Sequence, residues 1–447
     1  MAECSKGFRG GGFLVYRCGR RHRNISKLKH RACKACLCSD TNASSEEYSA
    51  LNPQKLRQGF LNAGHFVDHL MMLIFAKAAF NAGLSFGLAK DGAYAEMIPY
   101  GVPALILFGA CAPLAAYLAD KWNRNAMITV FFVGVGIAAI ITSFAQTPLQ
   151  MAFGMGLLGI FAAIYHPIGI TMVIQGGGNV GWRLGINGVW GNMGIATAPL
   201  ITGFLLADYD WRMAFIVPGV FSILVGIGYT YFAKRGRIKP PIATAQEKGM
   251  VGFTPGWKRA LCALTLVSAG GGFVFGTMTF IIPRMFEVSL TELSADVAVT
   301  GALAALVYAI SSFTQLITGR IIDRSDVRPV LMTVALGQPI FIGIMAMETD
   351  YALFAVSFLA LSFVFGQVPI TDAVLSRYVP DEWRAKALSI KFLLNLVIGA
   401  MALLCARYIL GIGGGFGTVM AVTAVSAIMI IAGALLLPKL KEVAAAT

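Results

Sequence analysis

Long uninterrupted apolar stretches recur along most of this 447-residue chain. Residues 127–144 and 416–437 are two examples. A helix rises 1.5 Å per residue, so about 20 apolar residues cross roughly 30 Å of hydrocarbon. The stretches are continuous and do not alternate with the period of two that is typical of a membrane β-barrel. The sequence therefore predicts an all-α, multi-pass membrane protein.

Composition supports the same class. Hydrophobic residues make up 57% of the chain and charged residues 13%, whereas roughly a quarter of a soluble domain is charged. The fifty glycines are typical of spans whose backbones pack closely in lipid. We predict twelve transmembrane helices, near residues 57–79, 98–119, 126–144, 148–174, 187–207, 212–232, 257–283, 297–318, 329–347, 351–376, 386–409 and 416–437.

The location of the net charge of +14 argues against a nucleic-acid partner. Residues 1–57 hold twelve Lys or Arg and four acids, and the rest of the excess is scattered between apolar stretches. One set of alternate loops, with the C-terminus, holds eighteen basic residues and the other set holds four. Basic residues are retained on the cytoplasmic side. We predict a protein of the cell (inner) membrane with both termini in the cytoplasm.

Residues 1–56 indicate a basic, disordered tail. An organellar targeting segment and a start codon assigned too early are the alternatives. The sequence Cys33-x-x-Cys36-x-Cys38 offers soft ligands but lacks the second ligand pair of a zinc site. We predict no metal and no cofactor.

An internal repeat divides the remaining chain. Matching residue pairs recur at offsets of 201 to 203, and they are Asp120-Lys121 with Asp323-Arg324, Pro167-Ile168 with Pro369-Ile370, and Trp182-Arg183 with Trp383-Arg384. Polar residues separate the two copies. We predict six-helix halves at 57–232 and 257–437, a cytoplasmic linker at 233–256 and a cytoplasmic tail at 438–447. Parallel repeats of this kind place a solute site between the halves.

Two loops at matching positions carry a motif. One reads Ala116-Tyr-Leu-Ala-Asp120-Lys121-Trp-Asn-Arg124, and the other contains Gly319, Asp323, Arg324 and Arg328. They resemble the GxxxDRxGR loop of the major facilitator superfamily, although alanine and asparagine replace both glycines of the first copy. The resemblance implies the fold of that superfamily and a cytoplasmic latch formed by Asp120, Lys121, Arg124, Asp323, Arg324 and Arg328. An ordinary positively charged turn is the alternative for either copy alone.

The fifth span carries small residues and a proline at Gly185, Gly194, Pro199 and Gly203. This resembles a degenerate form of the superfamily's antiporter motif, G(x)8G(x)3GP(x)2GG. A proline bends the helix, and small residues allow close helix contact. The resemblance favours export slightly over uptake, although kinked, glycine-rich helices also occur without any such role.

Ionisable groups inside the hydrocarbon are costly and are therefore candidates for function. His65, Asp68 and His69 occupy one face of the first span at spacings of three and four residues. A carboxylate paired with an imidazole there could load and release a proton near physiological pH. A fixed hydrogen-bonded pair is the alternative.

His166 precedes Pro167 in the fourth span. The proline leaves the carbonyl of residue 163 without its helical donor and kinks the span, so the imidazole of His166 either caps local backbone or faces the cavity. Tyr165-His166-Pro167, together with residues 65–68, resembles the fosmidomycin-resistance branch of the superfamily. Asp372 and Lys391 are further candidates for proton coupling or substrate binding, although Lys391 could instead snorkel to the interface. Arg284 and Arg407 either anchor the outer ends of spans or gate them.

The sequence thus predicts a secondary transporter that moves a small organic solute by alternating access, coupled to protons. Its predicted partners are the small-molecule substrate, protons and the lipid bilayer. Proton-symport uptake of a small metabolite is the first alternative, and a transporter-like membrane sensor is the second. No P-loop and no HExxH motif occurs, so nucleotide hydrolysis and metalloprotease chemistry lack support. The cargo, the direction, the stoichiometry and the oligomeric state stay open.

Overall fold

The computed structural model describes residues 53–175, 180–238, 252–322 and 324–438. Most of the predicted tail with its cysteines, much of the predicted linker, Asp323 and the last nine residues lie outside these ranges.

Every regular element in these ranges is a helix, and no strand is found there. There are fourteen described helices: α2 (Pro53–Ser85), α3 (Ala93–Lys121), α4 (Arg124–Ser143), α5 (Pro148–Ala162), α6 (Tyr165–Ile174), α7 (Val180–Asp208), α8 (Met213–Lys234), α9 (Trp257–Ser289), α10 (Val297–Ser312), α11 (Thr314–Ile322), α12 (Val327–Met345), α13 (Asp350–Tyr378), α14 (Asp381–Gly411) and α15 (Gly415–Leu436). They provide twelve segments that are long and apolar enough to cross a membrane. The predicted all-α class and the number of spans are confirmed.

The fourth span is interrupted next to its histidine. Helix α5 ends at Ala162 and α6 begins at Tyr165. A proline lacks a backbone donor, and its ring clashes with the carbonyl four residues earlier, which here belongs to Ala163. Pro167, in the first turn of α6, favours this break, but a proline alone does not cause one, since Pro369 at the matching position of the second half lies inside the uninterrupted helix α13.

Helix α2 is the most buried of the twelve spans. It packs against α7 most extensively and also touches α3, α6, α8 and α9. Asp68 and Lys77 are both buried on it, at 0% and 1% exposure. Since lipid and apolar side chains solvate charge poorly, each of these groups depends on what the neighbouring helices present.

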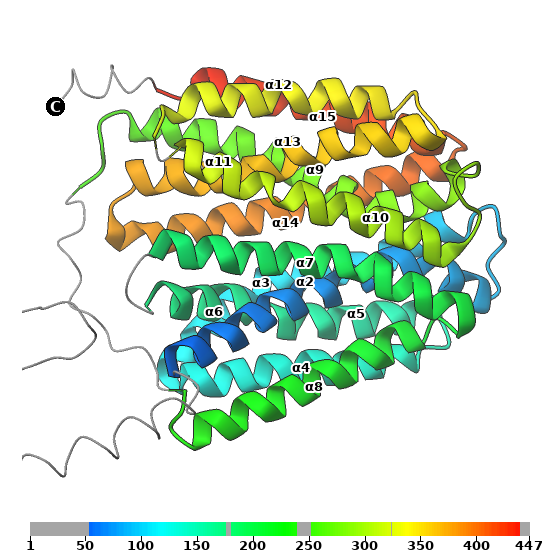
Figure 1. Cartoon of the computed structure of the whole chain (residues 1–447), viewed down its shortest axis with the longest axis horizontal. Helices are drawn as coiled ribbons and strands as arrows, with labels where there is room; N and C mark the ends of the chain where they lie inside the picture. Colours follow the sequence, from blue (N-terminus) through cyan, green and yellow to red (C-terminus); the bar gives the residue numbers. More distant parts are fainter. Residues whose placement is uncertain (1–52, 176–179, 239–251, 323, 439–447) are drawn as a thin grey trace, which may run out of the picture. The chain divides into compact units, whose positions relative to one another are not determined.

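Pairs of helices pack closely within each half and also across the halves. Figure 1 shows α12 and α15 side by side at one edge, and α4 and α8 side by side at the other. Two contacts join the halves most extensively, those of α7 with α10 and of α3 with α14.

The small residues predicted in the fifth span lie at such contacts. A Cβ on Gly194 would come within 2.2 Å of the carbonyl oxygen of Phe66 on α2. A Cβ on Gly203 would come within 2.9 Å of the carbonyl oxygen of Val297 on α10. Helix α7 therefore packs backbone against backbone with one helix of its own half and one of the other half.

Candidate functional site

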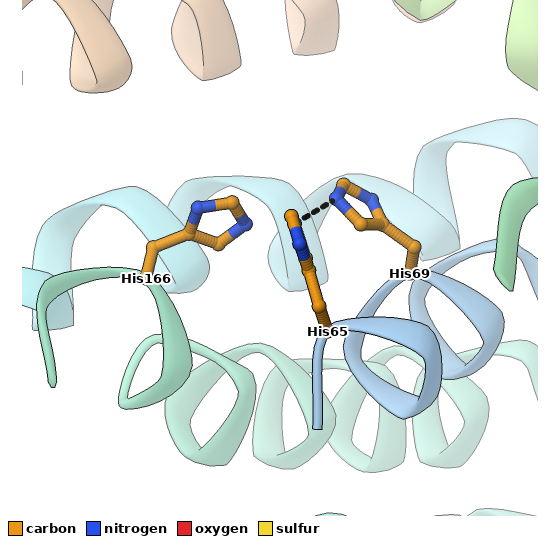
Figure 2. A group of neighbouring side chains, drawn as sticks. All are labelled: His65, His69 and His166. Atoms are coloured by element: carbon orange, nitrogen blue, oxygen red, sulfur yellow. Dashed lines mark hydrogen bonds between the residues drawn. The ribbon is translucent and has the colours of Figure 1, made fainter. Parts of the chain in front are cut away.

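Two of the predicted site histidines meet on α2. Residues four positions apart are neighbours on a helix face, and Nε2 of His69 lies 3.2 Å from Nε2 of His65. Figure 2 shows the two rings close together, with the ring of His166 near both of them. The spacing in the sequence was sufficient to predict the first pair.

The ring of His65 is held in one orientation. Its Nδ1 lies 2.8 Å from the backbone carbonyl oxygen of Asn187 on α7, and its face stacks on Tyr165 with 5.1 Å between the ring centroids. Because a carbonyl only accepts, Nδ1 carries the donated hydrogen, and the neutral ring then has a lone pair on Nε2. Gly191 leaves room there, since a Cβ on it would approach Nε2 to 2.7 Å.

A buried polar network that the sequence analysis missed fixes α2, α6 and α7 around this ring. The hydroxyl of Tyr165 donates to the carbonyl oxygen of Leu61 at 2.6 Å. The side-chain amide of Asn187 donates to Asn62 Oδ1 at 3.1 Å and to the Tyr165 hydroxyl at 3.0 Å. Asn187 is fully buried. Its position in an apolar span could have indicated from the sequence that such a polar network exists.

His166 joins this group from α6. Its ring centroid lies 5.2 Å from that of His65 and 5.6 Å from that of His69. One ligand-capable atom from each of these three histidines lies within 4.8 Å of the other two. The contact of His166 with the other two histidines was not predictable from the sequence, because it depends on how α6 packs against α2.

Asp68 is the most isolated charge-bearing group of the site. Its side chain is 0% exposed, and its Oδ2 lies 3.3 Å from Nε2 of His166. The two atoms are not oriented for a hydrogen bond, and neither carboxylate oxygen has a hydrogen-bond partner among the described residues. A buried polar group without partners is costly, which points to a role beyond packing.

The site borders the second half through aromatic rings. The ring of His166 packs on Phe392 of α14 at 4.7 Å and lies 5.5 Å from Phe108 of α3. Next to Phe392, Lys391 forms an ion pair with Asp372 and donates to Thr371 Oγ1 at 2.7 Å. Lys391 is therefore paired with a carboxylate of α13.

A second ionic cluster, which we call the Glu287 cluster, connects the halves further along α2. Lys77 forms an ion pair with Glu287 of α9 and donates to Thr300 Oγ1 of α10 at 3.2 Å. Arg284 contacts the same carboxylate at 2.5 Å, and its guanidinium lies 3.5 Å from the ring centroid of Phe80. Of these residues only Arg284 was identified as a candidate from the sequence. Lys77 could have been identified as well, because a lysine inside a predicted span needs a partner there.

The predicted latch residues lie at helix ends. Asp120 and Arg124 approach to 3.5 Å, and Arg124 also donates to Gln175 Oε1 at 2.5 Å. Lys121 lies 5.7 Å from the ring centroid of Tyr117. In the second copy, Arg328 donates to the carbonyl oxygen of Leu435 at 2.9 Å, Arg324 is exposed, and Asp323 lies outside the described residues.

The remaining predicted candidates are placed as follows. Gly185 of α7 has only the Leu316 side chain near its Cβ position, at 3.6 Å. The carbonyl oxygen of Pro199 lies 2.4 Å from the Cβ position of Gly301 on α10. Arg407 is exposed near the end of α14.

Twelve apolar helices in two halves, with ionisable groups where the halves meet, define a membrane transporter and not an enzyme of the aqueous phase. The sequence profile of the Major Facilitator Superfamily matches residues 70–291 and 270–446. The chain therefore belongs to this superfamily and is a multi-pass transporter of small solutes.

Three similar proteins show how far the likeness extends. The probable sulfoacetate transporter SauU of Cupriavidus necator is 26% identical over 294 residues, which are 60% of this chain and 67% of that protein. The multidrug resistance protein MdtG of Rahnella sp. is 29% identical over 130 residues, covering 29% of this chain and 32% of that protein. The crystal structure of a bacterial homologue of the human lysosomal transporter Spinster, inward-facing and unoccupied, has a TM-score of 0.68 and 14% identity, covering 87% of this chain and 98% of that chain. The structural likeness concerns the fold alone.

The Glu287 cluster generates a stability prediction. Lys77 and Arg284 share one carboxylate, so Glu287→Gln leaves two cations without their anion, whereas Lys77→Met leaves one intact pair. Breaking a buried ion pair costs about 3–5 kcal/mol. We expect Glu287→Gln to lower the thermal unfolding midpoint of the purified protein much more than Lys77→Met does.

Asp210→Asn is the matched control, because Asp210 is 53% exposed and its partner Arg212 is only partly buried, and ion pairs near the surface contribute about 1 kcal/mol at most. Equal effects of Glu287→Gln and Asp210→Asn would mean that the shared carboxylate does not stabilise the contact between the halves.

Proposed function

We propose that this protein is a proton-coupled secondary transporter that moves a small organic solute across the cell membrane by alternating access, with both termini in the cytoplasm. The observation that supports the coupling is Asp68, a fully buried carboxylate whose oxygens have no hydrogen-bond partner in the described part of the chain. Alternating access moves one half against the other about a central site.

The position of Asp68 suits a proton site. Its neighbour His166 packs on Phe392 of the second half, so a change of charge at Asp68 reaches the contact between the halves through a single side chain. Imidazole is the side chain best suited to exchange protons near neutral pH. Under this proposal His65 and His69 orient or tune the pair, and Asp372 with Lys391 binds or couples on the opposite half.

Export is the direction we favour. The resemblance of residues 185–203 to the antiporter motif, and of residues 65–68 and 165–167 to the fosmidomycin-resistance exporters, supports it. MdtG is named a multidrug resistance protein, which is consistent with export. Proton-driven uptake is the second candidate, and SauU makes a small organic acid such as sulfoacetate the first solute to test for it. The match to the superfamily over most of the chain favours transport over a sensor without transport.

Vesicle orientation distinguishes the two directions. Everted and right-side-out vesicles from cells expressing the protein would be energised in the presence of labelled sulfoacetate and of a panel of toxic compounds. We expect accumulation in everted vesicles only. Accumulation in right-side-out vesicles would establish uptake, and the absence of flux in both, for every solute, would favour the sensor.

Asp68→Asn tests the coupling. An amide keeps the shape of the carboxyl group but cannot take up or release the proton, so we expect proton-driven accumulation to disappear while solute exchange at equal concentrations continues. Asp91→Asn, at an exposed loop position, is the matched control and should leave both unchanged. Full proton-driven accumulation by Asp68→Asn would rule out this coupling site.

The latch is a separate proposal. The ion pair of Asp120 with Arg124, and the bond from Arg124 to Gln175 at the end of α6, would stabilise one conformation of the first half. Asp120→Ala should slow turnover severalfold and leave solute affinity within about twofold, since exposed pairs contribute little binding energy. An unchanged turnover rate in proteoliposomes would refute the latch.

A further inference from the structure

Three imidazoles of this bundle converge on one point, and transport alone does not require that arrangement. His65 and His69 belong to α2 and His166 to α6, and one ligand-capable atom of each lies within 4.8 Å of the others. The three rings, labelled in Figure 2, form a triangle with centroid distances of 4.9, 5.2 and 5.6 Å. Imidazole is the commonest protein ligand of transition metals, so the cluster has the composition of a metal centre.

The spacing of the first two nitrogens fits a tetrahedral ion. Zinc binds imidazole nitrogen at about 2.0–2.1 Å, and tetrahedral angles then place two such nitrogens about 3.3 Å apart. The Nε2 atoms of His65 and His69 are separated by 3.2 Å. The third ring has to move only about 1–2 Å closer, which a side-chain rotation of His166 supplies.

The surroundings of His65 are those of a metal ligand. Metal-binding histidines almost always donate their second ring N–H to a carboxylate or to a backbone carbonyl. Nδ1 of His65 does so to Asn187 at 2.8 Å, which directs the lone pair of Nε2 towards His69. The absence of a side chain on Gly191 keeps the space beside Nε2 free.

The charge of Asp68 and the partial exposure of two of the histidines also favour a metal site. Asp68 is fully buried, and among the described residues its oxygens lack hydrogen-bond donors, yet one of them lies 3.3 Å from His166. A dication bound by neutral imidazoles would supply the positive charge that this carboxylate otherwise lacks. His69 and His166 are only partly buried, and the side chain of His166 is 22% exposed, so the described protein atoms do not fully enclose the ligands.

We propose that His65, His69 and His166 bind one divalent transition-metal ion, for which Zn²⁺ is the probe of choice. The three ligands leave a fourth position for water or solute, as in open zinc sites. The site links α2 to α6 within the first half. The competing interpretation is a hydrogen bond from His69 to His65 with no metal, which requires neither the approach of His166 nor the unpartnered carboxylate.

Direct binding decides between the two. Zn²⁺ titration by calorimetry would use the full-length protein in detergent, purified with a tag that contains no histidine. The background variant carries replacements at every histidine and cysteine of the tail, namely His22→Ala, His30→Ala and serine at Cys4, Cys18, Cys33, Cys36 and Cys38. We expect one ion per chain, and a Co²⁺ complex with the strong visible absorption of tetrahedral coordination.

Single-ligand variants provide the contrast. Loss of a group that merely supports a ligand lowers metal affinity by about 10–100-fold, so His69→Ala and His166→Ala should each lower it by at least that much. Cys262→Ser, at an exposed position away from the cluster, should leave affinity unchanged. Size-exclusion profiles and circular dichroism would confirm that the variants are folded. Unchanged affinity in both histidine variants, or no saturable binding in the background variant, would overturn the proposal.

A second readout rests on the proposed function. Zn²⁺ at this site would occupy the space beside Asp68 and tie α6 to α2, so it should inhibit transport by the background variant at the concentration that saturates binding. The transport that His69→Ala retains, compared with and without Zn²⁺, should resist it. Saturable binding without inhibition would support the metal site and would contradict the assignment of proton coupling to Asp68. Inhibition that persists in His69→Ala would show a different site of action.

Discussion

An ionisable side chain inside an apolar helix needs a partner within the protein, on its own helix or on a neighbouring one, because lipid supplies none. Much of the interior organisation of this protein follows from that constraint. Lys77 of α2 reaches Glu287 of α9, and Lys391 of α14 reaches Asp372 of α13. Asp68 lies against His166 of α6. Each of these contacts requires a particular packing of two helices, so the polar groups select among arrangements that apolar surfaces alone would leave nearly equivalent.

The spans were predictable from the sequence because their length is fixed by the membrane and not by tertiary packing. Crossing the hydrocarbon takes about 20 apolar residues whatever the neighbouring helices are, so all twelve were located. The break beside Pro167 was less predictable, since Pro369 at the matching position lies inside an uninterrupted helix. Helix ends were less predictable. Helix α2 begins at Pro53 and α9 continues to Ser289, because polar residues extend a helix beyond the apolar stretch that defines the span.

The site was predictable only where it is local. His65 and His69 are neighbours by helical geometry alone, and their contact is observed. The contact of His166 with Asp68, the bond of His65 to the carbonyl of Asn187 and the ion pair of Lys77 with Glu287 join residues that are about 100 to 210 positions apart. Periodicity within one helix carries no information about which face of another helix it meets. Asn187 and Lys77 were nevertheless visible as polar residues in apolar spans, which is the signal that such contacts exist.

Helix α2 carries both Asp68 and Lys77 of the Glu287 cluster, so it connects these two sites mechanically. Asp68 and Lys77 are nine residues apart, which is about 14 Å along a helix, and the helix between them is buried and uninterrupted. Lys77 is paired with the second half, whereas Asp68 contacts His166 of the first half, whose ring packs on Phe392 of the second. A rotation of the halves that opens the bundle at Lys77 must therefore separate an ion pair, whereas near His166 it changes contacts of aromatic and aliphatic side chains between α3 and α14. For the proposed transport cycle, the costly step lies at the Glu287 cluster, and the apolar contact of His166 is where a change of charge at Asp68 can shift the balance between conformations.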